Sequence, residues 1–318
     1  MSDFVRIPVG KGTPEGVNSA YVLPDSGVVI DPGPPTDSSW SALRDGIDET
    51  EMSVQEIDHV LVTHWHADHA GLACRLADRA NASVHLHEGD AHLVGNYTEA
   101  RQKRLRRDAD ILGRWGVPEP VCESLLDRDS PSPLPDTYPV QTHEEGDRIA
   151  GIELIHTPGH TKGHASFATA ETLFLGDVLL PTYTPNVGGS DTRLEDPLAA
   201  YLSSMERVET VAAGRTGEPG HGTTMVVDEA IKTVREHHHE RAEDAFEVVA
   251  TMNEPTAWTV AGELFGEMNG IHAKFGAGEA AAHLDRLEAL EVVERVGADP
   301  VRYSTVVDDY PPNVNLTP

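Results

Sequence analysis

Five histidines and two aspartates in this chain stand at positions where a metal ion could gather them. The densest group is residues 63–69, Thr-His-Trp-His-Ala-Asp-His. His64 and His66 are two residues apart after an apolar run, and side chains two apart in extended chain point to the same side. Both can therefore bind one ion, whereas Asp68 and His69 lie where the chain changes direction and can reach a second ion.

Three more residues of ligand type stand singly later in the chain, His160, Asp177 and His221. Each follows a predicted strand or lies in a tight turn beside glycine, which lets the backbone approach an ion closely. Imidazole with carboxylate is a donor set for zinc or a comparable borderline ion, whereas calcium and magnesium prefer oxygen. The residue types therefore predict a metal centre with zinc as first choice and manganese or iron as alternatives.

The elements that must position these residues alternate between strand and helix. Strands are expected at 19–23, 28–30, 57–62, 148–156, 165–170 and 172–175, and helices at 38–49, 70–79, 97–115 and 197–213. Residues of about 95–140 form an expected insertion, in which the proline-rich stretch 118–139 is an insertion or lid. This order predicts a layered α/β domain.

The composition shifts after Val226. Helices are expected at 228–252, 256–266 and 278–290, followed by a hairpin of 292–296 and 301–305 around a turn at 297–300. Three helices and a hairpin resemble a winged-helix module. The predicted domains are 1–226 for catalysis, 227–307 for a small winged-helix-like α+β domain, and 308–318 as a tail.

In their order from Asp31 to His221, these motifs resemble those of the metallo-β-lactamase superfamily. The resemblance implies an αββα four-layer sandwich and two zinc ions per chain. It assigns His64, His66 and His160 to the first ion, Asp68, His69 and His221 to the second, and Asp177 as the bridging carboxylate. Asp31 matches a strand-end aspartate of structural role. The reaction expected of such a site uses a metal-bridging hydroxide, which Asp68 is placed to orient and whose proton it passes on.

Two subgroups of this superfamily are similar to the chain, the glyoxalase II-type thioesterases (hydroxyacylglutathione hydrolases) and the β-lactamase-like protein 2 group. The latter, which pairs this core with a C-terminal winged helix and includes endoribonucleases, matches more of the chain. Asp177 replaces the cysteine that true β-lactamases often carry, and the 43 residues between Asp177 and His221 leave no room for the large domain inserted in the RNA-processing nucleases. We expect a hydrolase that cleaves an ester, thioester or lactone of a small anionic substrate. A single-strand-specific endoribonuclease is the alternative.

The charge balance limits the kinds of partner that the protein can bind. Lys and Arg number 24 against 53 Asp and Glu, a net charge of −29 that opposes binding to nucleic acid or to anionic membranes. A different hypothesis is a metal-sensing regulator that binds DNA through the winged helix. Residues 256–306 hold eight acidic and four basic side chains, however, whereas a groove-reading module carries a basic face. The acidic excess with only five lysines also resembles proteins of halophiles.

Several nearby residues are predicted to lie outside the ligand set. His164 is a candidate for a supporting or substrate contact, His59, His85 and His87 are expected to pack or face solvent, and His237 to His239 to form a solvated helix face. Cys74 is expected to be a small buried apolar residue. The five cations within Arg101–Arg107 either face solvent or grip an anionic substrate. The two cysteines, together with the lack of a signal peptide in Met1–Lys11 or of an apolar run of membrane length, predict a cytoplasmic protein.

Overall fold

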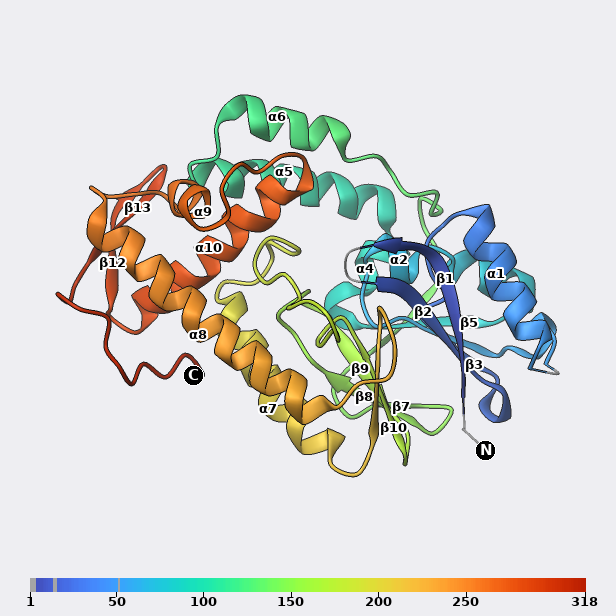
Figure 1. The fold of residues 1–318 in the computed structure, drawn as a ribbon. Helices are drawn as coiled ribbons and strands as arrows, with labels where there is room; N and C mark the ends of the chain where they lie inside the picture. The colour runs from blue at the N-terminus through green and yellow to red at the C-terminus, as the bar shows by residue number, and fades with distance from the viewer. Residues whose placement is uncertain (1–3, 14–15, 51) are drawn as a thin grey trace. The chain divides into compact units, whose positions relative to one another are not determined.

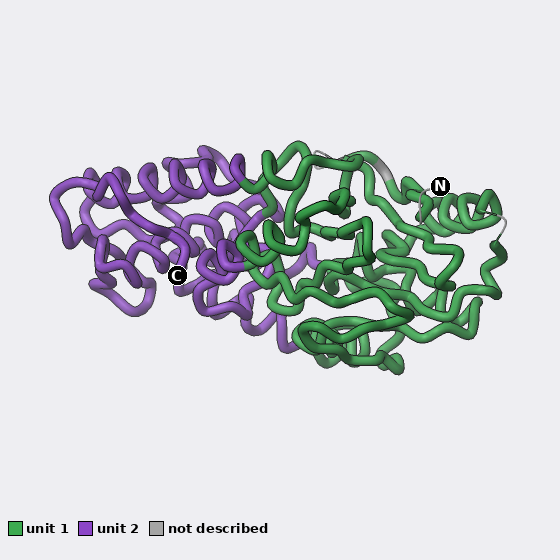
Figure 2. The backbone as a smooth tube through the Cα atoms, turned by 90° about the horizontal axis from the view of Figure 1, so that it is seen from below, with its two compact units in different colours: residues 1–101, 131–185, 204–231 green, residues 102–130, 186–203, 232–318 purple. Residues whose placement is uncertain are grey.

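The computed structural model describes residues 4–13, 16–50 and 52–318 (Figure 1), so the first residues of the segment Met1–Lys11 lie outside it. The chain forms two compact units, coloured separately in Figure 2. Unit 1 comprises Met1–Arg101, Pro131–Pro185 and Ser204–Ile231, and unit 2 comprises Gln102–Ser130, Asn186–Ser203 and Lys232–Pro318. None of the helices in the described part of the chain combines the length and apolar character needed to cross a bilayer.

Unit 1 contains two mixed sheets. The larger has six strands in chain order, β1 (Val5–Thr13), β2 (Gly16–Leu23), β3 (Val28–Ile30), β4 (His59–Leu61), β5 (Ser83–His87) and β6 (Val140–His143). Strands β1 to β3 pair antiparallel and β3 to β6 parallel. The smaller sheet has the order β11 (Thr216–Pro219), β10 (Thr172–Gly176), β9 (Ala165–Ala168), β8 (Ile152–His156) and β7 (Arg148–Ile149), and only its β10–β11 pair is parallel.

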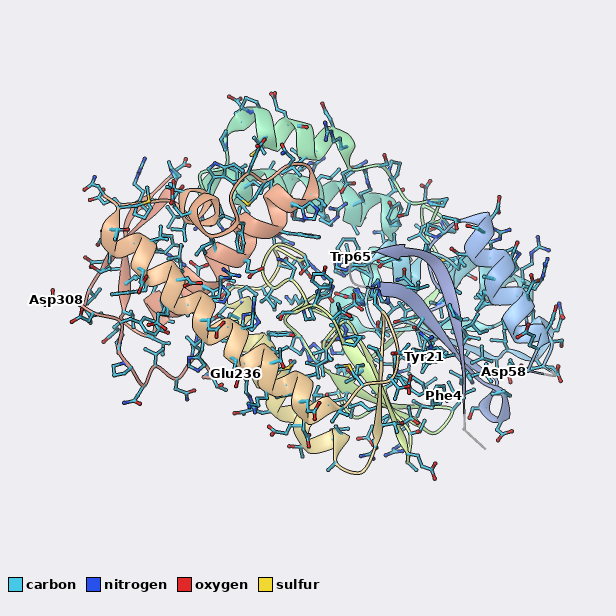
Figure 3. All side chains as sticks on the ribbon, in the orientation of Figure 1. Phe4, Tyr21, Asp58, Trp65, Glu236 and Asp308 are labelled. Carbon is cyan, nitrogen blue, oxygen red and sulfur yellow. The ribbon has the colours of Figure 1, made fainter. Side chains whose placement is uncertain are left out.

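The two sheets bury one face of each against the other. Side chains alternate along a strand, so Tyr21 and Leu23 of β2 join the core between the sheets while Ala20 and Val22 join the core on the outer face. The inner core continues into the smaller sheet with Phe174, whose ring centroid lies 5.0 Å from that of Tyr21. Phe4 completes this aromatic group and is labelled with Tyr21 in Figure 3.

Helices cover the outer face of the larger sheet. The short and long helices of this region are η1 (Pro24–Ser26), α1 (Asp37–Asp48), η2 (Val54–Glu56), α2 (Ala67–Ala70), α3 (Ala73–Ala80) and α4 (Glu88–Gly95). Helix α1 is capped at its N-terminus by Thr36, whose side chain accepts a hydrogen bond from the Ser39 N–H, and it buries Leu43 and Ile47 in the outer core. Cys74 of α3 is buried in the same core, as predicted.

Unit 2 is mainly helical. Its elements are α6 (Glu119–Arg128), α9 (Ala257–Phe265), α10 (Ile271–Ala289), β12 (Val293–Ala298) and β13 (Val301–Thr305), with parts of α5 (Tyr97–Arg114), α7 (Pro197–Ala212) and α8 (Val227–Thr251). One core cluster joins Leu112 of α5 to Ala277 of α10, with Trp115 and Trp258 packed against it. The predicted three helices and hairpin are thus present, and their likeness to a winged helix remains a prediction.

The proline-rich stretch contains a helix, α6, because its prolines lie in the first turn of that helix or outside its ten residues, where proline is tolerated. Two sequence-based expectations about these elements were wrong. Helix α10 begins at Ile271, seven residues earlier than predicted. The expected strand 148–156 is two strands, β7 and β8, because Ala150 and Gly151 both adopt positive φ and reverse the chain.

The expected solvated face at His237 to His239 was also wrong for one of the three. His238 is 1% exposed, and its Nδ1 lies 3.1 Å from Nε2 of His283. In α8, position 238 follows the buried Ile231 and Val234 at helical spacing, which places it on the packed face.

Candidate metal centre

All seven residues predicted as ligands lie together in unit 1, in the loops and the short helix α2 that follow its strands. His64, His66, Asp68 and His69 follow β4 and run into α2, and His160 lies in the loop between β8 and β9. Asp177 follows β10, and His221 follows β11. Among the described residues, their ligand atoms form three overlapping groups: His64, His66 and His160; His64, His69 and Asp177; and Asp68, His69 and His221.

The first group has the spacing of a single ion site. Nδ1 of His66 lies 2.9 Å from Nε2 of His64 and 3.1 Å from Nε2 of His160. Nitrogens bound to one tetrahedral zinc ion would lie about 3.4 Å apart. His64 is completely buried and His160 is 8% exposed, whereas His66 is partly exposed.

The group of Asp68, His69 and His221, called the second group from here on, converges in the same way, and Asp177 lies between it and the first group. Nε2 of His69 lies 3.3 Å from Nε2 of His221, and Oδ2 of Asp68 lies 3.5 Å and 3.3 Å from these two atoms. Oδ2 of Asp177 lies 3.4 Å from both Nε2 atoms and 3.9 Å from Nε2 of His160. Asp177 therefore faces histidines of both groups.

Asp31 orients one histidine of each group. Its Oδ2 accepts hydrogen bonds from the Thr63 hydroxyl (2.7 Å) and from Nδ1 of His69 (2.9 Å). Since the Thr63 hydrogen points to Asp31, Oγ1 of Thr63 can only accept from Nδ1 of His64, 3.0 Å away. These bonds hold the protons of both rings on Nδ1 and leave both Nε2 lone pairs directed into the site. The predicted structural role of Asp31 agrees with this geometry.

Glycine at position 220 permits the close approach of the loops. A Cβ atom there would stand 2.3 Å from Oδ1 of Asp177 and 2.7 Å from Cε1 of His69. The Gly220 N–H donates to the Gly176 carbonyl at 2.7 Å, and its own carbonyl accepts from the Ser19 N–H. The backbone at Gly220 thus ties strand β2 and the Asp177 turn to the His221 loop.

The electrostatics suit a cation. Burial alone would lower the pKa of His221, but Asp177 and Asp68 raise it to about 10. In the first group, burial and the neighbouring His160 lower the pKa of His66 to about 3. Buried Oδ1 of Asp177 has no hydrogen-bond partner among the described residues. Neutral imidazoles in the first group and carboxylates that raise the pKa of His221 both favour positive charge in the site, which fits one or more divalent ions.

Three supporting residues complete the site. Nε2 of His164 accepts a hydrogen bond from the Asp177 N–H at 3.0 Å, so its lone pair is engaged and it positions Asp177 without joining the ligand groups.

Asp90 accepts from Thr161 Oγ1 (2.6 Å), from the Gly163 N–H (2.9 Å) and from the Trp65 N–H (3.3 Å), which joins the two loops that carry the first group. Asn18 of β2 donates to Oδ2 of Asp68 at 3.1 Å.

Sequence reasoning missed Asp90 and Asn18. Neither stands near a ligand in the sequence, and no spacing marks them. A supporting role of His164 was predicted only as one of two alternatives, the other being a substrate contact.

The other histidines considered from the sequence lie apart from the three ligand groups. His85 and His87 are buried, as expected for packing residues, and the His87 ring stacks on His156 at 3.8 Å. In the basic segment, Arg104 forms ion pairs with Asp108 (3.3 Å) and Asp129 (2.7 Å), so it acts within the structure of unit 2.

Comparisons with known proteins identify the family of the chain. The family model of the metallo-beta-lactamase superfamily matches residues 12–229. The chain is 27% identical to the probable metallo-hydrolase YqjP of Bacillus subtilis over 305 residues, covering 91% of this chain and 92% of that protein. It is 29% identical to the beta-lactamase-like protein 2 homolog of Drosophila melanogaster over 195 residues, which span 61% of this chain and 54% of the fly protein.

A solved structure extends the likeness over both units. The metallo-beta-lactamase family protein TTHA1429 of Thermus thermophilus superposes with a TM-score of 0.78 at 26% identity, covering 96% of this chain and 99% of that one. The matched family segment contains all seven ligand candidates. The chain belongs to the metallo-β-lactamase superfamily.

Proposed function

We propose that this protein is a hydrolase with two metal ions per chain, zinc being the first choice. The observation that carries the proposal is the position of Asp177, whose Oδ2 lies within 3.9 Å of Nε2 of His160, His69 and His221. His64, His66 and His160 would hold one ion, Asp68, His69 and His221 the other, and Asp177 both. Two ions in such a site supply Lewis acidity and lower the pKa of bound water toward neutrality.

Asp68 is the proposed catalytic base. Its side chain is 42% exposed, whereas those of His69, His221 and Asp177 are at most 9% exposed. Its Oδ2 is held by Asn18 while the carboxylate remains open to solvent. Asp68 can therefore accept a proton at the site and pass it to water.

The proposed substrate is a small anionic ester, thioester or lactone. The names of the relatives support a metallo-hydrolase, and the site is compatible with attack at either a carbonyl or a phosphoryl centre. The chain is similar to the beta-lactamase-like protein 2 homologs of fly and nematode. Because the resemblance described above places endoribonucleases in that group, cleavage of single-stranded RNA is the second candidate.

The test combines metal analysis with a substrate panel. The purified chain should contain about two ions per molecule, and plasma mass spectrometry would distinguish zinc from manganese and iron. The loaded protein is then offered a thioester, a lactone and single-stranded RNA, with Asp68→Asn as control. Turnover of the thioester or lactone supports the first candidate, and turnover of RNA alone supports the second. A folded protein that binds no metal on reconstitution would overturn both.

The C-terminal helices α8 to α10 with the β12–β13 hairpin are proposed to be a winged-helix module that serves the hydrolase. Between Thr256 and Val306 the module carries the eight acidic and four basic residues noted above, so phosphate contacts along DNA would meet a net repulsion. Specific binding of duplex DNA by the full chain at physiological salt would favour the regulator hypothesis instead.

We further propose that the acidic surface is an adaptation to high salt. Charges that repel over about 30 Å at 0.01 M salt are screened within about 3 Å at 1 M. The melting temperature should therefore rise from low salt to molar KCl. A flat or falling melting temperature would contradict the adaptation.

A further inference from the structure

Unit 2 contains a cavity of about 490 Å³ that is separate from the ligand residues. Its walls come from α5, the segment 188–197, α10 and the β12–β13 hairpin, all within unit 2, and none of the seven ligand candidates lines it. The volume lies in the range of about 300 to 1,000 Å³ found for small-molecule sites. Size alone therefore admits a ligand.

The cavity is positively charged in an acidic chain. Arg107 and Arg114 of α5 line it, and their spacing of seven residues places them on one face of the helix. Within the described residues, neither guanidinium forms a hydrogen bond or an ion pair. Against a net charge of −29, two unpaired arginines at one cavity mark a place where an anion is favoured.

Apart from Glu195, the other charged groups that line the cavity are paired. Asp285 accepts hydrogen bonds from Arg295 (2.7 Å) and from the Tyr303 hydroxyl (2.6 Å). The Arg193 Nε–H donates to Asp191 at 2.9 Å. Among the lining acids, Glu195 alone is left to oppose Arg107 and Arg114, so the cavity keeps a positive excess.

The remaining walls are apolar and closely packed. Ile111, Trp115 and Val301 line the cavity beside Ala281 and Ala282 of α10. At the base, α10 meets the segment 188–197 backbone to backbone, since a Cβ atom on Gly278 would stand 2.3 Å from Cα of Gly189. The cavity therefore combines an apolar floor with a cationic side.

We propose that this cavity binds a small organic phosphate with an apolar or aromatic body, of the size of a nucleoside monophosphate. Guanidinium groups match phosphate oxygens with paired hydrogen bonds, and Trp115 offers an aromatic surface to the body. Arg107 and Arg114 are about 10 Å apart along the helix axis, a distance over which two long side chains can meet at one dianion. This proposal does not depend on the hydrolytic reaction.

The experiment is calorimetric titration of the metal-loaded full chain with AMP, adenosine and inorganic phosphate. The double variant R107Q/R114Q removes both unpaired charges, and Arg106→Gln is the matched control, because Arg106 is exposed on the same helix but does not line the cavity. Thermal unfolding and metal content verify that each variant is folded and loaded. We expect AMP to bind more tightly than adenosine or phosphate, and its Kd to rise by about tenfold or more in R107Q/R114Q and to change less than about twofold in R106Q.

Three results would overturn the proposal. The first is absence of AMP binding by the wild-type protein. The second is an unchanged Kd in R107Q/R114Q, which would place the bound nucleotide elsewhere, including at the metal ligands. The third is binding of a short single-stranded RNA that depends on Arg107 and Arg114 when AMP does not bind, which would assign the cavity to nucleic acid.

Discussion

Unit 1 contains two groups of histidines, and their nitrogens are arranged differently. In the candidate metal centre, nitrogens of five histidines converge around Asp68 and Asp177. In what we call the histidine row, His59, His85 and His143 follow one another across β4, β5 and β6. Nδ1 of His59 lies 3.0 Å from Nε2 of His85, and Nδ1 of His85 lies 2.9 Å from Nε2 of His143.

The difference shows what separates a ligand group from a packed group. In the histidine row, each contact joins one nitrogen to one nitrogen, so a proton between each pair satisfies both. Both nitrogens of His85 are used in this way. In the metal centre, Nδ1 of His66 faces two Nε2 atoms at once, which one proton cannot satisfy. Convergence of lone pairs beside carboxylates, and not the number of histidines, distinguishes the site.

The largest effect is expected from Asp177→Ala. This change removes the one carboxylate that faces both groups, so metal content should fall from about two ions to one or fewer and hydrolysis should drop at least about 10³-fold. Mass spectrometry of the purified variant measures the metal. The control is Asp147→Ala, because Asp147 is a carboxylate beside the last histidine of the histidine row, with its Oδ2 3.5 Å from Nδ1 of His143. Equal metal loss in both variants would remove the distinction between the two groups.

Asp68→Asn should separate catalysis from structure. The amide cannot accept a proton, so turnover of a confirmed substrate should fall about 10²- to 10⁴-fold. The melting temperature should change little, since the side chain is partly exposed. Turnover equal to that of the wild-type protein would show that Asp68 is not the base.

Asp31→Asn should weaken metal binding by about 10- to 100-fold. Both carboxylate oxygens of Asp31 accept hydrogen bonds, and the amide group of asparagine would oppose a donor at one of them. Competition with a chelator measures the affinity of each variant. Thr63→Val removes only the hydroxyl between Asp31 and His64 and should weaken metal binding less than Asp31→Asn does. A larger loss of affinity in Thr63→Val would show that Asp31 is not the main residue that orients the ligands.

The smallest effect concerns the histidine row and its dependence on pH. Burial and the neighbouring His59 lower the pKa of His85 to about 4, whereas histidine in an unfolded chain titrates near 6.5. Between about pH 6.5 and pH 4 the unfolded state therefore binds more protons, and His85 lowers the free energy of unfolding as the pH falls. His85→Gln should reduce this slope by up to about one proton, measured by urea unfolding at several pH values. The metal content of His85→Gln should equal that of the wild-type protein. If the free energy of unfolding depends on pH as steeply in His85→Gln as in the wild-type protein, His85 is not the source of this dependence.

Residue types and spacing determined the chemical character of this protein. The run His64 to His69 and the three later positions could be recognised because short-range spacing and glycine neighbours are visible along the chain. Strand β3 and the ends of helices α1 and α7 agree with the predictions to within about one residue, because their apolar periods and turn residues are local signals. The family resemblance supplied the sheet sandwich, which the two packed sheets confirm.

Only the tertiary structure decided which side chains from segments far apart in the sequence meet. Asn18 and Asp68, or Asp90 and Gly163, meet because strands and loops far apart in sequence pack together, and no local pattern encodes such a pairing. The same holds for His238, which is polar by type but buried by its place on α8. The two unpaired arginines are likewise ordinary surface residues along the chain. Their common cavity exists because α5, α10 and the hairpin enclose one volume, and that enclosure depends on three-dimensional packing.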